Sequence, residues 1–65
     1  MKYQGNYTVN EQAVRDHYGE DDLHRANIEI VVLNQLLKMA DNELSAQQVW
    51  LLETAIKQGF LDKIE

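Results

Sequence analysis

The segment from Asp22 to about Ala40 constrains the fold of this chain more than any other part of the sequence. Its apolar residues alternate three and four apart, which places them in an unbroken seam along one side of a helix. The residues of this seam are Leu23, Ala26, Ile30, Leu33, Leu37 and Ala40. A second apolar stripe on the opposite side contains Ile28, Val32, Leu36 and Met39. Because a helix with two apolar sides must be covered over most of its circumference, we expect residues 22–40 to form the central helix of the fold.

A shorter helix is predicted before the central one, over about residues 9–18. Thr8 and Glu11 have the spacing of a capping box, in which each side chain accepts a hydrogen bond from a backbone N–H at the helix start. Gly19 follows as a left-handed stop. The acidic residues 20–22 then precede the central helix, where carboxylates cap free N–H groups and favour the positive end of the helix dipole.

A third helix is predicted over about residues 46–58, and it has the clearest start signal. Ser45 and Gln48 form a capping box, and Gly59 ends the helix. The two apolar residues after Gly59 are expected to fold back onto the helix as its apolar C-terminal contact. The core face of this helix is expected to hold Val49, Leu52, Ala55 and Ile56.

The remaining segments are an N-terminal arm (residues 1–8) and a short tail (residues 59–65). Tyr3 and Tyr7 fall on alternate positions of the arm, which favours an extended strand over a helix. A lone strand is marginal in water, so the arm must pack on its own helices or pair with a second copy. We therefore expect residues 1–65 to form one all-α domain of three helices with an extended arm.

A chain of 65 residues has little capacity for a core, since one core of this size rarely supplies more than about 3–5 kcal/mol. The chain contains no cysteine, so neither a disulfide nor a thiolate metal site adds to its stability. The central helix also has more apolar surface than two short helices can cover. We therefore expect a homodimer with the seam from Leu23 to Ala40 as its interface, and a monomeric three-helix bundle is the alternative.

No residue pattern in the chain predicts catalysis or a bound cofactor. Residues 16–24 hold two histidines and four carboxylates, but they do not match the spacing of a calcium-binding loop. His17 and His24 are seven apart across a glycine, whereas a zinc-binding pair on one helix is four apart. Ser45 is the only serine and serves as a helix cap, and the glycines are too isolated to form a phosphate loop. We expect no enzymatic activity, no metal, no cofactor and no small-molecule substrate.

The formal charge of −5 argues against general nucleic-acid binding, which requires an excess of lysine and arginine. A helix-turn-helix transcriptional regulator is an alternative, because the third helix follows a tight turn and Gln47 and Gln48 can in principle read adenine. That helix carries one cation, Lys57. No apolar run approaches the roughly 20 residues of a membrane span and no secretory leader opens the chain, so we expect a soluble, cytoplasmic protein.

Trp50 is the most informative single residue, because it lies on the side of the third helix opposite the predicted core face. Tryptophan and tyrosine are enriched at interface hot spots, although the tail or the N-terminal tyrosines could instead cover Trp50. We expect a small acidic protein–protein interaction module, namely a homodimeric regulator or inhibitor that covers a partner's surface. A structural assembly subunit is the second alternative. The partner-facing residues are expected to be Tyr3, Tyr7, Trp50, Glu53, Thr54 and Lys57.

Overall fold

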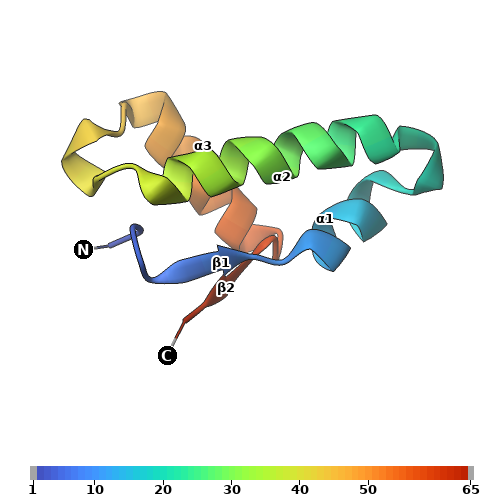
Figure 1. Ribbon diagram of the computed structural model, residues 1–65, viewed down its shortest axis with the longest axis horizontal. Coiled ribbons are helices and arrows are strands. Elements are labelled where there is room, and N and C mark those ends of the chain that lie inside the picture. The colour runs from blue at the N-terminus through green and yellow to red at the C-terminus, as the bar shows by residue number, and fades with distance from the viewer. Residues whose placement is uncertain (1, 65) are drawn as a thin grey trace.

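The computed structural model describes residues 2–64, which form a mostly helical fold with a small two-stranded sheet (Figure 1). The order of its elements is β1 (Tyr7–Val9), α1 (Glu11–Tyr18), the 3-10 turn η1 (Glu20–Asp22), α2 (Leu23–Lys38), the 3-10 turn η2 (Asp41–Glu43), α3 (Ala46–Lys57) and β2 (Leu61–Lys63). The prediction of three helices is confirmed. The all-α class needs one correction, because the arm and the tail contribute a strand each.

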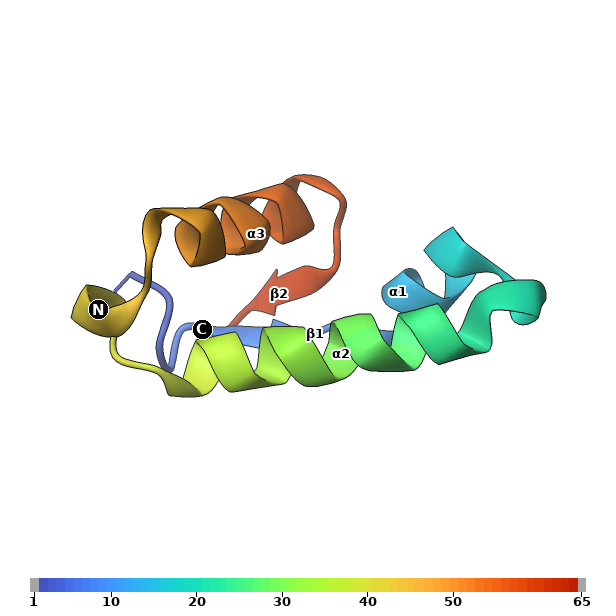
Figure 2. The ribbon, with the colours of Figure 1, turned by 90° about the horizontal axis from the view of Figure 1, so that it is seen from above.

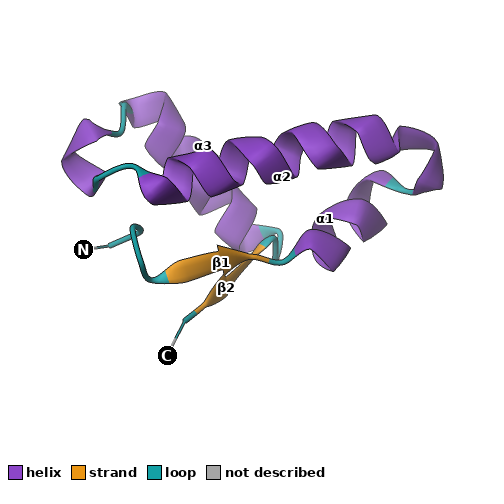
Figure 3. Ribbon diagram, viewed as in Figure 1, coloured by secondary structure: helices purple, strands orange, loops and turns teal. Residues whose placement is uncertain are grey.

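The sheet joins the two ends of the chain (Figure 3). β1 and β2 are antiparallel, with Tyr7 opposite Lys63 and Val9 opposite Leu61. The arm was predicted either to pack on its own chain or to pair with a second copy, and the structure shows the first arrangement. Its specific partner is the tail, which sequence patterns did not indicate. Because strands of three residues are marginal alone, this sheet depends on the helices that pack against it.

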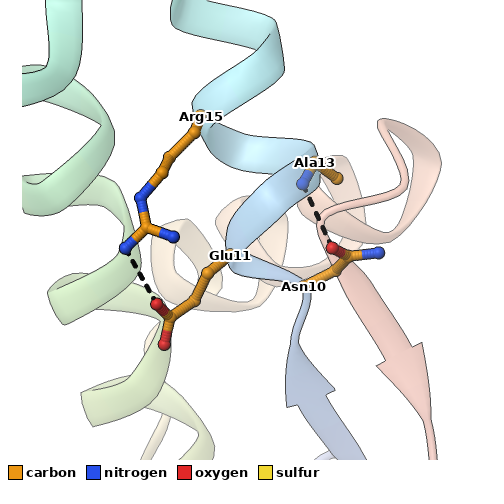
Figure 4. Close-up of polar contacts among 4 residues, drawn as sticks. All are labelled: Asn10, Glu11, Ala13 and Arg15. Carbon is orange, nitrogen blue, oxygen red and sulfur yellow. Dashed lines mark hydrogen bonds and ion pairs between the residues drawn. The ribbon is translucent and has the colours of Figure 1, made fainter.

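The start of α1 differs from the prediction (Figure 4). The Oδ1 atom of Asn10 accepts a hydrogen bond from the backbone N–H of Ala13 at 3.1 Å, so Asn10 is the N-cap. Thr8 lies in β1, where its backbone is extended, and Glu11 forms an ion pair with Arg15 at 3.0 Å. The predicted capping box of Thr8 and Glu11 is therefore wrong, because strand pairing holds residue 8 away from the helix start.

The segment between α1 and α2 also differs in part. Gly19 ends α1 as predicted, with a φ of 81° and its N–H donating to the carbonyl of Arg15 at 2.8 Å. Residues 20–22, however, form η1, and no side-chain capping bond is present at Asp22, the N-cap of α2. The predicted carboxylate cap at this residue is therefore wrong. Met39 leaves the helix in an extended conformation, so α2 is two residues shorter at its C-terminal end than expected.

Both predicted ends of α3 are confirmed. Ser45 Oγ accepts from the N–H of Gln48 at 3.2 Å, while Gln48 Oε1 accepts from the N–H of Ser45 at 2.8 Å. At the other end Gly59 has a φ of +80°, and the N–H of Phe60 donates to the carbonyl of Ala55 at 2.9 Å. This is a Schellman motif, and it turns the chain directly into β2.

The core of the fold is formed by residues from every helix together with the arm and the tail. Its buried side chains are Tyr3, Val14, Ala26, Ile30, Leu33, Leu36, Leu37, Leu52, Ala55, Phe60 and Leu61. Tyr3, Phe60 and Leu61 supply apolar contacts that the two short helices alone could not provide. Figure 2 shows α2 along one edge of the molecule, with α1, α3 and the strands beside it.

The residues predicted to form the dimer interface lie mostly inside this core. Ala26, Ile30, Leu33 and Leu37 are buried within one chain, whereas Ala40 is half-buried. Leu23, at the start of the helix, is exposed. The four buried positions must therefore be removed from the predicted interface, because their side chains already have their contacts within the chain and cannot receive a second copy.

Candidate functional site

The N-terminal segment (residues 2–6) is held against the connection between α2 and α3 by Asp41. The Asp41 carboxylate accepts hydrogen bonds from the backbone N–H groups of Lys2, Tyr3 and Gln4, the last two at 3.2 and 3.1 Å. Desolvation raises the pKa of Asp41, but the N–H donors of Gln4, Lys2 and Tyr3 together lower this pKa by more, so the carboxyl group titrates below its ordinary range. The Gln4 side chain also donates to the carbonyl of Lys38 at 3.1 Å. These contacts position the segment beside α3.

A pocket of about 170 Å³ lies between the N-terminal segment, β1 and α3. It is lined by Lys2, Tyr3, Tyr7, Glu53, Ile56 and Lys57. The pocket contains four of the six residues predicted to face a partner, and these four come from two parts of the chain about 50 positions apart. It is smaller than the roughly 300–1,000 Å³ typical of sites for small molecules, so its size suits a single side chain better than a whole cofactor.

The two tyrosines of the pocket have different environments. Tyr3 is 3% exposed and belongs to the core, so it forms the floor of the pocket rather than a free surface. Its ring centroid lies 6.4 Å from that of Tyr7, which is half-buried. The Nζ atom of Lys2 lies 5.2 Å from the centroid of the Tyr3 ring, within the range of a cation–π contact. Lys2, Glu53 and Lys57 are exposed, so the pocket has an aromatic floor and a rim that carries both signs of charge.

Trp50 lies on the same helix as Glu53 and Thr54, about one turn closer to the N-terminus of α3. Its side chain is 61% exposed. Phe60 and Leu61 do fold back, as predicted, but they enter the core and leave Trp50 uncovered. The prediction that the tail or the N-terminal tyrosines could cover Trp50 is therefore wrong within a single chain.

The histidines of the acidic segment before α2 are separated. The ring of His17 lies edge-on to Phe60, with a distance of 5.2 Å between centroids, and 5.1 Å from Tyr18. Burial raises the pKa of Tyr18, and the nearby charge of Glu29 raises it further. Across residues 2–64, no group of three or more histidine, cysteine, aspartate or glutamate side chains could hold a metal ion. Within the same residues, no helix has the length and apolar character that crossing a membrane requires.

Three features of this surface were not identified from the sequence. Lys2 and Ile56 line the pocket, but only the docking of the N-terminal segment on α3 brings them together. The role of Asp41 had no local signal, because the backbone N–H groups that donate to its carboxylate lie 37 to 39 positions away in the sequence. The exposed positions of α2, including Val31, depend on which side of the helix the other elements cover.

Comparison with known proteins identifies no relative of this chain, since no family model, no curated protein and no solved structure matches it.

Proposed function

We propose that this chain is a small, non-enzymatic protein–protein interaction module that acts as a homodimeric regulator or inhibitor by covering the surface of a partner protein. The observation that carries the proposal is the exposure of Trp50, at 61%, on the helix that also forms one wall of the aromatic pocket. Exposed large apolar side chains beside a polar rim are typical of protein interaction sites, and tryptophan is enriched among hot-spot residues.

The geometry supports a binding mode with two parts. Trp50 would pack against the partner, while the pocket beside Glu53 and Lys57 would receive one side chain of that partner. Lys2 and Lys57 are positive and Glu53 is negative, so the rim of the pocket carries both signs of charge. Such a rim would orient a partner through charge pairing rather than attract every partner of one net charge.

Affinity purification from the source cells with three baits tests this proposal. The baits are the natural chain, a Trp50→Ala variant and an Ile64→Ala variant, the last of which removes an exposed apolar side chain outside the pocket. Circular dichroism first checks that all three are folded. We expect a partner that binds the natural chain and Ile64→Ala but binds Trp50→Ala at least about 30-fold more weakly, the usual effect at a hot spot. A partner that binds all three equally would contradict the role of Trp50.

Two further measurements separate the alternative functions. A DNA-binding regulator would shift duplex DNA in a mobility assay at low salt, and raising the salt would abolish the shift. The outer face of α3 offers Lys57 next to Glu53, which does not favour that outcome. A structural assembly subunit would form large oligomers, which light scattering would detect. We expect neither result.

A further inference from the structure

The Tyr3 hydroxyl is the one buried polar side-chain atom among residues 2–64 that has no hydrogen-bond partner. Tyr3 is 3% exposed and forms the floor of the pocket between the N-terminal segment and α3. A buried hydroxyl without a partner destabilises the fold, because it loses its hydrogen bonds to water and gains none in return. Such a group at the floor of a pocket therefore points to an occupant that supplies the missing hydrogen bond.

The Tyr3 hydroxyl lies toward the end of the pocket that Lys2 lines. The Nζ atom of Lys2 lies 5.2 Å from the centroid of the Tyr3 ring. The ammonium approaches the hydroxyl without completing a hydrogen bond, and this interaction with Tyr3 is the largest of the causes that raise the pKa of Lys2 above its ordinary value. Because exposed side chains change rotamer within nanoseconds, Lys2 can move aside and admit a ligand atom to the hydroxyl.

The charged residues around the pocket favour an anion. Two lysines, Lys2 and Lys57, and one glutamate, Glu53, give the rim a formal charge of +1, so the rest of this chain of charge −5 carries −6. Neither lysine is held in an ion pair, because the one ion pair among residues 2–64 joins Glu11 to Arg15. The rim is therefore a small positive region on an acidic protein, with both of its cations available to a ligand.

A carboxylate has the hydrogen-bonding capacity that this arrangement requires. A tyrosine hydroxyl can donate one hydrogen bond, and a lysine ammonium only donates. An occupant that contacts both groups must therefore be an acceptor, and the two oxygens of a carboxylate accept several hydrogen bonds at once. Ile56 and the half-buried Tyr7 add apolar surface to the same pocket, which suits the methylene groups of an acidic side chain.

We propose that this pocket binds the carboxylate of a glutamate side chain on the surface of the partner protein. The inference rests on the proposed function and identifies the chemistry of the partner residue. The Tyr3 hydroxyl donates to one carboxylate oxygen, while Lys2 and Lys57 pair with the negative charge. Glutamate suits the site better than aspartate, because its longer side chain reaches past the rim and packs its methylenes against Ile56 and Tyr7.

Titration with a short peptide tests the pocket directly. The probe is acetyl-Ala-Glu-Ala-amide, and its uncharged counterpart has glutamine in place of glutamate. Binding is followed through the backbone amide NMR signals of residues 2–7 and 53–57 at constant ionic strength. We expect a dissociation constant of about 1–10 mM for the glutamate peptide, and binding of the glutamine peptide at least about tenfold weaker. Equal binding of the two peptides, or no shift at about 50 mM, would overturn the inference.

Tyr3→Phe removes the hydroxyl alone and gives two independent readouts. Because this hydroxyl has no partner within the described chain, the Tm should stay the same or rise. Binding of the glutamate peptide should weaken at least about tenfold. A clear fall in Tm would show that the hydroxyl is already hydrogen-bonded in the fold and would overturn the inference, as would unchanged peptide binding.

Charge variants of the rim should act in opposite directions. Lys57→Gln should weaken binding of the glutamate peptide, whereas Glu53→Gln should strengthen it by removing a like charge. Lys63→Gln is the matched control, since Lys63 is exposed and lies outside the pocket, and it should bind like the natural chain. Equal weakening by Lys57→Gln and Lys63→Gln would show attraction by overall charge and would overturn the assignment to the pocket.

Propionate carries the same terminal group as glutamate without a peptide. Propionate that binds more than about tenfold more tightly than the peptide would overturn the choice of a protein side chain and indicate a site for small carboxylates. These titrations use the chain alone, so they are independent of the affinity purification with Trp50→Ala. Failure of the titrations would leave the interaction module with another occupant in its pocket, whereas failure of the purification would contradict the module and leave carboxylate binding unaffected.

Discussion

Replacing Leu33 with alanine tests the central feature of the fold, which is that α2 buries one side and exposes the other. Leu33 is 1% exposed, whereas Val31, two positions earlier, is 56% exposed. Truncation of a buried leucine to alanine costs about 3–5 kcal/mol, because apolar contacts are lost and a cavity remains. Val31→Ala should change the free energy of unfolding by no more than about 0.5 kcal/mol, since the side chain is mostly in water.

These free energies translate into large differences in melting temperature. With an unfolding entropy of about 2.1 cal/mol/K per residue, each kcal/mol lowers the Tm of a 65-residue chain by about 7 °C. Leu33→Ala should therefore lose about 20 °C or more, which approaches the whole stability expected for a domain of this size. Ile30→Val is a milder test at a position that is 7% exposed, and it should cost about 0.5–1.5 kcal/mol, or about 4–11 °C.

The assay is thermal and urea unfolding followed by far-UV circular dichroism. If Val31→Ala destabilised the chain as much as Ile30→Val, the assignment of the inner and outer sides of α2 would be wrong. If Leu33→Ala unfolded with an unchanged Tm, the core described above would be refuted.

Three further predictions concern the ends of elements. Asn10→Ala should lower the free energy of unfolding by about 1 kcal/mol, measured by urea unfolding, while Thr8→Ala should have a much smaller effect because Thr8 caps no helix; equal effects would contradict the cap assignment. Gly59→Ala should lower the free energy of unfolding by about 1–2 kcal/mol. Because nothing lies within 4 Å of the added Cβ, this loss comes from the φ of +80°. Gly59→Asn should recover part of the lost stability in the same assay. Folding lowers the pKa of Asp41, so the stabilising contribution of its carboxylate is present at neutral pH and is lost as the pH falls through the folded-state pKa. Amide hydrogen exchange of residues 2–4 should show this acid-dependent opening in the natural chain and in the control Asp62→Asn. The Asp41→Asn variant should not show it.

Sequence reasoning worked best where the deciding contacts are local. The capping box of Ser45 and Gln48 and the Schellman turn at Gly59 were both predicted, because each depends on hydrogen bonds between residues at most five positions apart. The same reasoning failed at Thr8, although its spacing from Glu11 was equally suitable. There pairing with β2 holds the backbone extended, and the alternation of Tyr3 and Tyr7 indicated a strand but not that its partner is the tail.

The candidate site was predicted in part for the same reason. The outward position of Trp50 follows from the helical period of α3 and is independent of the rest of the chain. The meeting of Tyr7 with Glu53 and Lys57 around one pocket depends on the docking of the N-terminal segment, which Asp41 secures from a distant turn.

The sequence by itself determined that three helices form and where most of them end, because helix propensity, caps and glycine stops act within a few residues. Only the tertiary structure decided which side of α2 is covered. The apolar seam of α2 was suited equally to a second copy or to other parts of its own chain, and periodicity cannot distinguish these two partners. Pairing of residues 7–9 with 61–63 brings both ends of the chain to the helices, so the seam is buried internally and Ile28, Val31 and Val32 remain outside. That pairing joins the most distant parts of the sequence. It is stabilised by apolar side chains that the two strands and the helices bury together, and no pattern within a short stretch of sequence predicts such burial.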